Sequence, residues 1–162
     1  MTSVRVEALD PTDPRSQAAL TQFLNEMVER VGADVLEIDI EQEAREDSGK
    51  NFFIVALDER DNVVGCGSLI QIEPQVGQIR RMWVNPVLRG HGIGRRLLSA
   101  LEGAGAVSGY EFIRLEVYEA LTEALLLFET SGYVQVDPWE QSPPDLKAYQ
   151  KQLIAAPVGV EE

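Results

Sequence analysis

The chain has 162 residues, of which 44% are hydrophobic and 25% charged, and a formal net charge of −13 at pH 7. This length predicts one globular domain, and so negative a chain is unsuited to nucleic acid or anionic lipid, whose phosphates require concentrated Lys and Arg. The sequence has no apolar run of the roughly 20 residues that a membrane span needs, no signal-peptide pattern, and too few cysteines and histidines for a metal cluster. We therefore expect a cytoplasmic protein that uses no metal.

One strand and one helix are expected at the start of the chain. Residues 4–9 alternate in polarity, which predicts a strand, and apolar residues recur at helical spacing over residues 15–30. Gly32 is expected to end this helix. The acidic residues 34–47 predict a loop that contains a short helix near residues 40–45.

Three further strands are expected in the middle of the chain, at residues 52–57, 63–72 and 78–84. Short polar turns at residues 58–62 and 73–75 separate them, which predicts an antiparallel meander. Cys66 lies in the second of these strands between glycines, and we interpret it as a small buried residue of the sheet.

A glycine-rich turn, Arg89-Gly90-His91-Gly92-Ile93-Gly94, follows the third strand and leads into a helix that runs from Gly92 to about Val107. Such a turn is suited to bind phosphate, because glycines let the backbone approach closely and the first N–H groups of the helix point at the anion. Several arginines give this part of an acidic chain a basic character: Arg80, Arg81, Arg89, Arg95 and Arg96.

Two common phosphate-binding motifs do not fit this turn. A dinucleotide-binding turn needs G-x-G-x-x-G, whereas these glycines are spaced G-x-G-x-G and follow antiparallel strands. A P-loop closes with Gly-Lys-Ser/Thr, whereas Gly94 precedes two arginines. A turn that binds nothing is disfavoured, because three glycines, flanking arginines and an amphipathic helix coincide here.

The last part of the chain is expected to complete the sheet. A strand, a helix and two further strands are expected at residues 112–118, 122–130, 133–136 and 146–153, respectively. Gly132 is suited to the left-handed position that ends the helix before it. We expect one domain over residues 1–155 and a disordered tail over residues 156–162.

The glycine turn resembles a known signature. Arg89-x-x-Gly92-x-Gly94 is similar to the Q/R-x-x-G-x-G/A motif of the GNAT superfamily, the GCN5-related N-acetyltransferases. The preceding strand at residues 79–84 resembles the same family, and residues 115–116 and 124–133 look like its second conserved block. The resemblance covers roughly residues 52–136 with the expected order of elements.

The resemblance implies an α/β (α+β) fold, with a mixed, mostly antiparallel central sheet that is splayed at the cofactor site and flanked by about four helices. It also implies acetyl-CoA as the cosubstrate, with its pyrophosphate on backbone N–H groups of the turn and its pantetheine arm along the preceding strand. A backbone N–H near Met82 would hold the oxyanion that develops on the thioester carbonyl. The implied cofactor-binding residues are Met82, Trp83, Val84, Arg89, Gly90, His91, Gly92, Ile93, Gly94 and Arg95.

The usual acid and base of the family are missing from the matching positions. Gln78 stands at the position of the base, Phe128 at that of the acid, and Leu121 replaces an associated Asn. A thiol with a pKa of about 8.5 leaves well enough near neutral pH, so the missing acid should slow the transfer without preventing it. The candidates for proton transfer, in part through water, are Glu73, Glu116 and Tyr118.

These features predict an N-acetyltransferase that moves an acetyl group from acetyl-CoA to a primary amine of a small molecule or peptide by direct attack. The alternative is a weak or inactive module that binds or senses acyl-CoA. The acceptor is expected near Trp83, Glu37 and Trp139, and a carboxylate at Glu37 suits a cationic amine. The expected partners are acetyl-CoA and the amine, without nucleic acid or membrane, and a homodimer is the candidate assembly.

Overall fold

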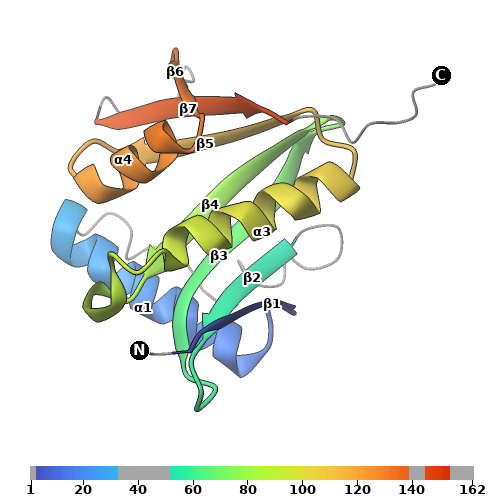
Figure 1. Ribbon diagram of the computed structural model, residues 1–162. Helices are drawn as coiled ribbons and strands as arrows, with labels where there is room; N and C mark the ends of the chain where they lie inside the picture. The colour runs from blue at the N-terminus through green and yellow to red at the C-terminus, as the bar shows by residue number, and fades with distance from the viewer. Residues whose placement is uncertain (1–2, 33–51, 139–144, 154–162) are drawn as a thin grey trace.

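A single mixed sheet organises the protein. The computed structural model describes residues 3–32, 52–138 and 145–153, and its seven strands have the order β1-β2-β3-β4-β5-β7-β6 (Figure 1). Only β4 and β5 are parallel neighbours, and the other adjacent pairs are antiparallel. The strands are β1 (Arg5–Leu9), β2 (Phe52–Leu57), β3 (Val63–Glu73), β4 (Val76–Val84), β5 (Phe112–Tyr118), β6 (Val134–Val136) and β7 (Leu146–Gln152).

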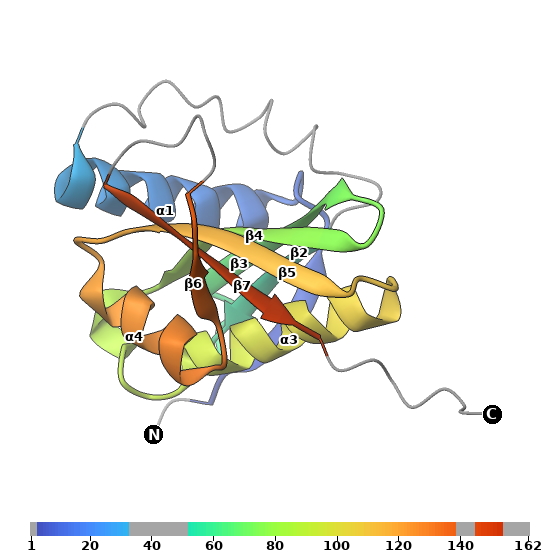
Figure 2. The ribbon, with the colours of Figure 1, turned by 90° about the horizontal axis from the view of Figure 1, so that it is seen from above.

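Helices cover both faces of the sheet. The described helices are α1 (Pro14–Val31), α3 (Ile93–Val107), α4 (Thr122–Thr130) and the short 3₁₀ helix η2 (Pro86–Leu88). α1 lies on one face, and α3 and α4 lie on the other (Figure 2). α1 begins where Asp13 accepts a hydrogen bond from the Arg15 N–H and ends at Gly32, as expected. The short helix expected near residues 40–45 lies outside the described residues.

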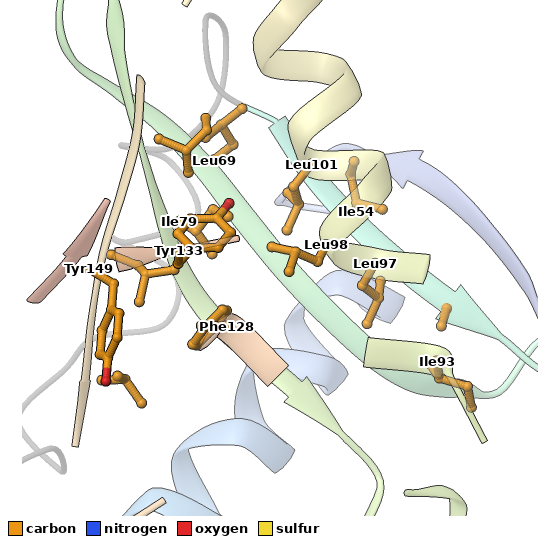
Figure 3. Packing of buried hydrophobic residues seen from close by; sticks show 14 of the residues in the cluster. Ile54, Leu69, Ile79, Ile93, Leu97, Leu98, Leu101, Phe128, Tyr133 and Tyr149 are labelled. Atoms are coloured by element: carbon orange, nitrogen blue, oxygen red, sulfur yellow. The ribbon is translucent and has the colours of Figure 1, made fainter. Parts of the chain in front are cut away.

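Each face of the sheet has its own core. Beneath α3, the apolar side of the helix packs on alternate strand residues, with Leu97, Leu98 and Leu101 against Leu69 and neighbouring side chains (Figure 3). On the opposite face, Ala19 and Leu20 of α1 pack on a second cluster that includes Phe53, Cys66 and Trp83. Cys66 has no exposed surface, which confirms its interpretation as a buried strand residue.

The sheet opens between its two parallel strands. The β4–β5 ladder ends at the pair Ile79–Leu115, while β4 continues to Val84 and β5 to Tyr118. Arg81 has a φ of 56°, and the β3–β4 register shifts beside it, so β4 carries a bulge where the two parallel strands part. The expected splay is therefore confirmed, and it leaves one edge of β4 without a neighbouring strand in the described part of the chain.

The expected elements that fall within the described residues are confirmed, with corrections at their ends. The antiparallel meander of β2, β3 and β4 is present, but the turn expected at residues 73–75 is only two residues long, because Glu73 and Val76 pair as strand residues. β6 begins at Val134, one residue later than expected, and the preceding Tyr133 is 3% exposed and packs in the core. The single-domain boundary and the tail stay predictions.

Candidate active site

A cavity of about 440 Å³ opens where β4 and β5 part, a size typical of small-molecule sites. Its walls come from both faces of the sheet, since α1 contributes on one side and the glycine turn and α4 on the other. The side chains from α1 and β4 are Phe23, Glu26, Met27, Arg30, Met82, Trp83 and Val84. Those from α4 and the residue before it include Leu121, Glu123, Ala124, Leu127 and Phe128.

The three glycines of the turn have two different structural roles. Gly90 and Gly92 have φ values of 86° and 83°, which a residue with a side chain adopts only under strain. A Cβ on either would meet no atom within 4 Å, so the space beside them is open. Gly94 instead allows close packing, because its Cβ would lie 3.2 Å from Leu127 of α4.

The start of α3 is arranged to receive an anion. Gly92 is the N-cap residue and supplies no side chain to the first N–H groups of the helix. The first turn of a helix leaves these N–H groups without intrahelical partners and carries the positive end of the helix dipole. Gly90, Gly92, Ile93 and Gly94 all line the cavity, so an anionic group within it can reach this backbone.

The side chains of the turn mostly bind other parts of the protein. Arg95 donates to the hydroxyls of Thr130 and Ser131 at distances of 3.0 and 3.1 Å, which ties α3 to the end of α4. His91 is exposed, and its Nδ1 lies 3.1 Å from the carbonyl oxygen of Leu88. Backbone groups, rather than these side chains, therefore remain to hold a phosphate.

A network of four charged side chains crosses the cavity. Arg89 donates from Nη2 to both carboxylate oxygens of Glu26 at 2.6 and 2.7 Å, and Trp83 Nε1 donates to Glu26 at 2.9 Å. Arg30 donates from Nη2 to Glu123 at 2.9 Å, so the network links α1 to α4. Two carboxylates thus face two guanidinium groups, and the network carries no net charge.

The network also sets the protonation of its carboxylates. Partial burial disfavours the charged form of Glu26, but hydrogen bonds from Arg89 and Trp83 outweigh it and hold the pKa below its ordinary value. Hydrogen bonds from Arg30 lower the pKa of Glu123, and this contact raises the pKa of Arg30. Both carboxylates are therefore ionised near neutral pH and already paired.

The three residues expected to transfer protons are not brought together in this cavity. Glu73 lies at the end of β3 and forms an ion pair with Arg114 at 2.9 Å. Glu116 and Tyr118 alternate along β5 with the core residues Leu115 and Val117, so they point to the opposite face from α3. None of the three is among the residues that line the cavity.

Two of the three positions at which the resemblance implies missing polar groups lie at the cavity. Leu121 precedes α4 and Phe128 is 4% exposed, with its ring edge-on to Tyr133 at 5.7 Å. Gln78 is not among the lining residues, and its side-chain oxygen accepts a hydrogen bond from Arg80 at 3.1 Å. The cavity therefore presents apolar surface at the position of the usual acid.

Several residues of this site were not expected from the sequence: Glu26, Arg30 and Glu123. Glu26 shares a helix face with Phe23 and Arg30, which is the only sequence signal that could have singled it out. Glu37 and Trp139, expected near the acceptor, lie outside the described residues.

In the described part of the chain, no three His, Cys, Asp or Glu residues are grouped to hold a metal, and no helix has the length and apolarity of a membrane span.

Comparison with known sequences matches residues 17–133 to the acetyltransferase (GNAT) family. A curated relative named "IAA acetyltransferase", from Azospirillum brasilense, is 38% identical over 86 residues. That match covers 51% of this chain and 55% of the relative, so it spans about half the length of each protein.

Solved structures share the fold at low sequence identity. A GNAT-family acetyltransferase from Staphylococcus aureus Mu50 superposes with a TM-score of 0.77 at 16% identity, covering 94% of this chain and all of that one. A putative acyl-CoA N-acyltransferase from Klebsiella pneumoniae gives 0.75 at 22% identity, with 93% and 98% covered. A putative acetyltransferase from Salmonella typhimurium, solved with its cofactor acetyl-CoA, gives 0.74 at 20% identity, with 93% and 94% covered.

The family match includes most of α1, the opened sheet, the glycine turn and all of α4, the same elements that build the cavity. The fold comparisons agree with it over almost the whole chain. The fold class and the resemblance expected from the sequence are confirmed, and the expectation of an acyltransferase agrees with them. The chain belongs to the GNAT family of acetyltransferases.

Proposed function

We propose that this protein is an acetyl-CoA-dependent N-acetyltransferase that moves an acetyl group to a primary amine by direct attack. The observation that carries the proposal is one cavity that joins a helix N-terminus suited to phosphate with the open edge of β4. A fold neighbour was solved with acetyl-CoA, and a partial relative is named as an acetyltransferase, which supports the same donor and reaction.

The chemistry of the cavity walls supports this donor. Backbone N–H groups of residues 90–95 would hold the pyrophosphate, which needs several donors and benefits from the helix dipole. The edge of β4 at residues 82–84 would pair with the amides of the pantetheine arm in the manner of an added strand. A backbone N–H near Met82, just after the bulge, would stabilise the thioester oxyanion.

Transfer requires one bond to form, one to break and two protons to move. The amine nitrogen attacks the carbonyl carbon, the carbon–sulfur bond breaks, the nitrogen loses a proton and the departing thiolate gains one. Glu26 and Glu123 line the cavity, but their ion pairs leave them unsuited to take a proton. We propose that catalysis depends on proximity and the oxyanion contact, with proton exchange through water.

The sequence-based candidates for proton transfer differ in how well their positions on the sheet support a catalytic role. Glu116 and Tyr118 lie on β5 just past the point where it leaves β4, so water could connect them to the opening. Glu73 has less support, because its partner Arg114 pairs with Gln78 on the stretch where β4 and β5 are still joined. The acceptor would enter from the α1 side, where Trp83 and Phe23 form the wall, and Glu37 and Trp139 are proposed to complete it.

A second candidate is a module that binds acyl-CoA without efficient transfer. The observation that favours it is the apolar surface that Leu121 and Phe128 present at the cavity. The single cysteine suits a reducing cytoplasm under either function, and a homodimer stays a prediction.

Release of CoA thiol distinguishes the two candidates. The purified chain is incubated with acetyl-CoA and tryptamine, spermidine, L-lysine or L-methionine, and thiol is followed with a chromogenic disulfide. If the protein transfers acetyl groups, the release of CoA thiol should depend on the amine. Gly92→Glu should abolish this release, because its carboxylate would occupy the open space beside the turn. Tight CoA binding by calorimetry without release for any amine would instead favour the binding module.

A further inference from the structure

Glu26 is the point at which three parts of the cavity meet. It belongs to α1, and it accepts hydrogen bonds from Trp83 on β4 and from Arg89 at the start of the glycine turn. Its side chain is only 16% exposed, and the Arg89 contact joins residues 63 positions apart in the chain. A carboxylate is thus held inside a mostly apolar cavity by hydrogen bonds from distant parts of the chain.

The partners of Glu26 occupy both of its oxygens. Oε1 accepts from Trp83 Nε1 and Arg89 Nη2, while Oε2 accepts from Arg89 Nη2 and from Arg30 Nη1 at 3.3 Å. A carboxylate has about four lone-pair directions, and here four contacts use them. Glu26 therefore has no site left to accept a proton from an amine. Its role is instead to hold its hydrogen-bond partners in place.

The contacts form a closed ring around the open end of β4. Arg89 donates from Nε to the carbonyl oxygen of Val84 at 3.0 Å, Arg89 Nη2 binds Glu26, and Glu26 binds the indole of Trp83, the neighbour of Val84. The ring fixes the turn that would hold pyrophosphate against the strand that would hold the oxyanion. It also joins both to α1, the wall of the acceptor side.

We propose that Glu26 is a positioning residue for acetyl transfer, which holds the phosphate-binding turn and the oxyanion strand in register through Arg89 and Trp83. This inference rests on the proposed function. It assigns a role to the Arg89 side chain as well, since the guanidinium points into the ring and the backbone of residues 90–95 is left for the anion. Glu26→Gln should therefore disturb the geometry of transfer more than the binding of the donor.

The test separates turnover from binding. With acetyl-CoA and the amine from the panel that reacts fastest, Glu26→Gln should lower kcat by roughly 10- to 100-fold, the cost of misplacing reacting groups by about 1 Å. KM for acetyl-CoA should change by less than about threefold, because uniform binding by the turn is retained. Glu29→Gln is the matched control, since Glu29 is exposed on the same helix and the substitution removes the same charge.

A spectroscopic signature distinguishes positioning from a general loss of stability. In a Trp139→Phe background, Trp83 is the remaining tryptophan, and Glu26→Gln should shift its emission because the indole N–H loses a charged acceptor. If Glu26→Gln does not fold, Trp83→Phe carries the test, since it removes the same hydrogen bond and keeps an aromatic ring. It should then lower kcat at nearly unchanged KM for acetyl-CoA.

The outcomes separate the two proposals. A folded Glu26→Gln protein with kcat within about twofold of wild type overturns the positioning role and leaves the proposed function intact. Effects of Glu26→Gln and Trp83→Phe that add in the double variant also contradict it, because residues that act as one unit are not additive. A wild-type chain that binds CoA but acetylates none of the amines overturns the proposed function, and the positioning role with it.

Discussion

The same substitution, Gly→Ala, should have opposite effects at Gly92 and Gly103. Neither Cβ would meet an atom within 4 Å, so only the backbone differs. Gly92 has a φ of 83° and a ψ of 6°, where Ala costs about 1–2 kcal/mol, so Gly92→Ala should destabilise the fold. Gly103 is exposed inside α3, where Ala is favoured over Gly by roughly 0.5–1 kcal/mol, so Gly103→Ala should stabilise it.

Thermal unfolding measures this difference directly. The two variants should differ by about 1.5–3 kcal/mol, which for a chain of this length separates their Tm values by roughly 3–12 °C around wild type. Calorimetry should also show weaker CoA binding for Gly92→Ala alone, since Gly92 lines the cavity and Gly103 does not. Two variants with the same Tm, or equal loss of CoA affinity in both, would refute the assignment of a left-handed backbone at the glycine turn.

Three further predictions follow from the environments of single residues. Burial raises the pKa of the Cys66 thiol to about 12, so iodoacetamide should modify Cys66 only after denaturation; modification of the native protein would contradict its burial. Phe128→Tyr places a hydroxyl at the cavity and should raise kcat by about tenfold. This gain is below the usual range for general acid catalysis because a thiolate leaves readily. An unchanged kcat in the thiol assay would argue against an acid at this position. The pKa of Glu26 is lowered in the folded protein, so its ionised carboxylate stabilises the fold fully above its ordinary pKa of 4.5, and this contribution is lost as pH falls through the folded-state pKa. In urea titrations, the wild type should therefore lose more stability on acidification than Glu26→Gln. Parallel losses in the two proteins would show that folding does not stabilise the carboxylate.

Local patterns in the sequence were sufficient for most of the fold. β5 and α4 have the predicted bounds, because their alternating and helical patterns end at clear turns or at Gly132. The hairpin between β3 and β4 was tighter than predicted, since a Pro-Gln pair can close a two-residue turn while both flanking residues still pair. Such boundaries depend on strand pairing, which local composition does not determine.

The glycine turn shows what the sequence could and could not reveal about the site. Its spacing pointed to a phosphate cradle and to the family, and the family is confirmed. The packing role of Gly94 depends on its close approach to Leu127 of α4. The sequence could not show this contact, because it forms only when distant elements pack.

The Glu26 ring was missed for the same reason. Arg89 belonged to a recognised motif, but its partner lies 63 residues earlier, on a helix whose sequence shows only an amphipathic pattern. The sequence-based candidates for proton transfer were polar residues near the conserved motifs along the chain: Glu73, Glu116 and Tyr118. The carboxylates that line the cavity come instead from α1 and α4. Nearness in sequence therefore identified the glycine turn at the cavity but not the charged residues of α1 and α4.

A crystal structure of the chain with CoA tests the central claim most directly. The account predicts the pyrophosphate on the backbone N–H groups of residues 90–95 and the thiol beside Met82 at the open edge of β4, with the Arg89–Glu26 pair intact. CoA bound elsewhere, or a pyrophosphate held by the Arg89 side chain with that ion pair broken, would contradict it.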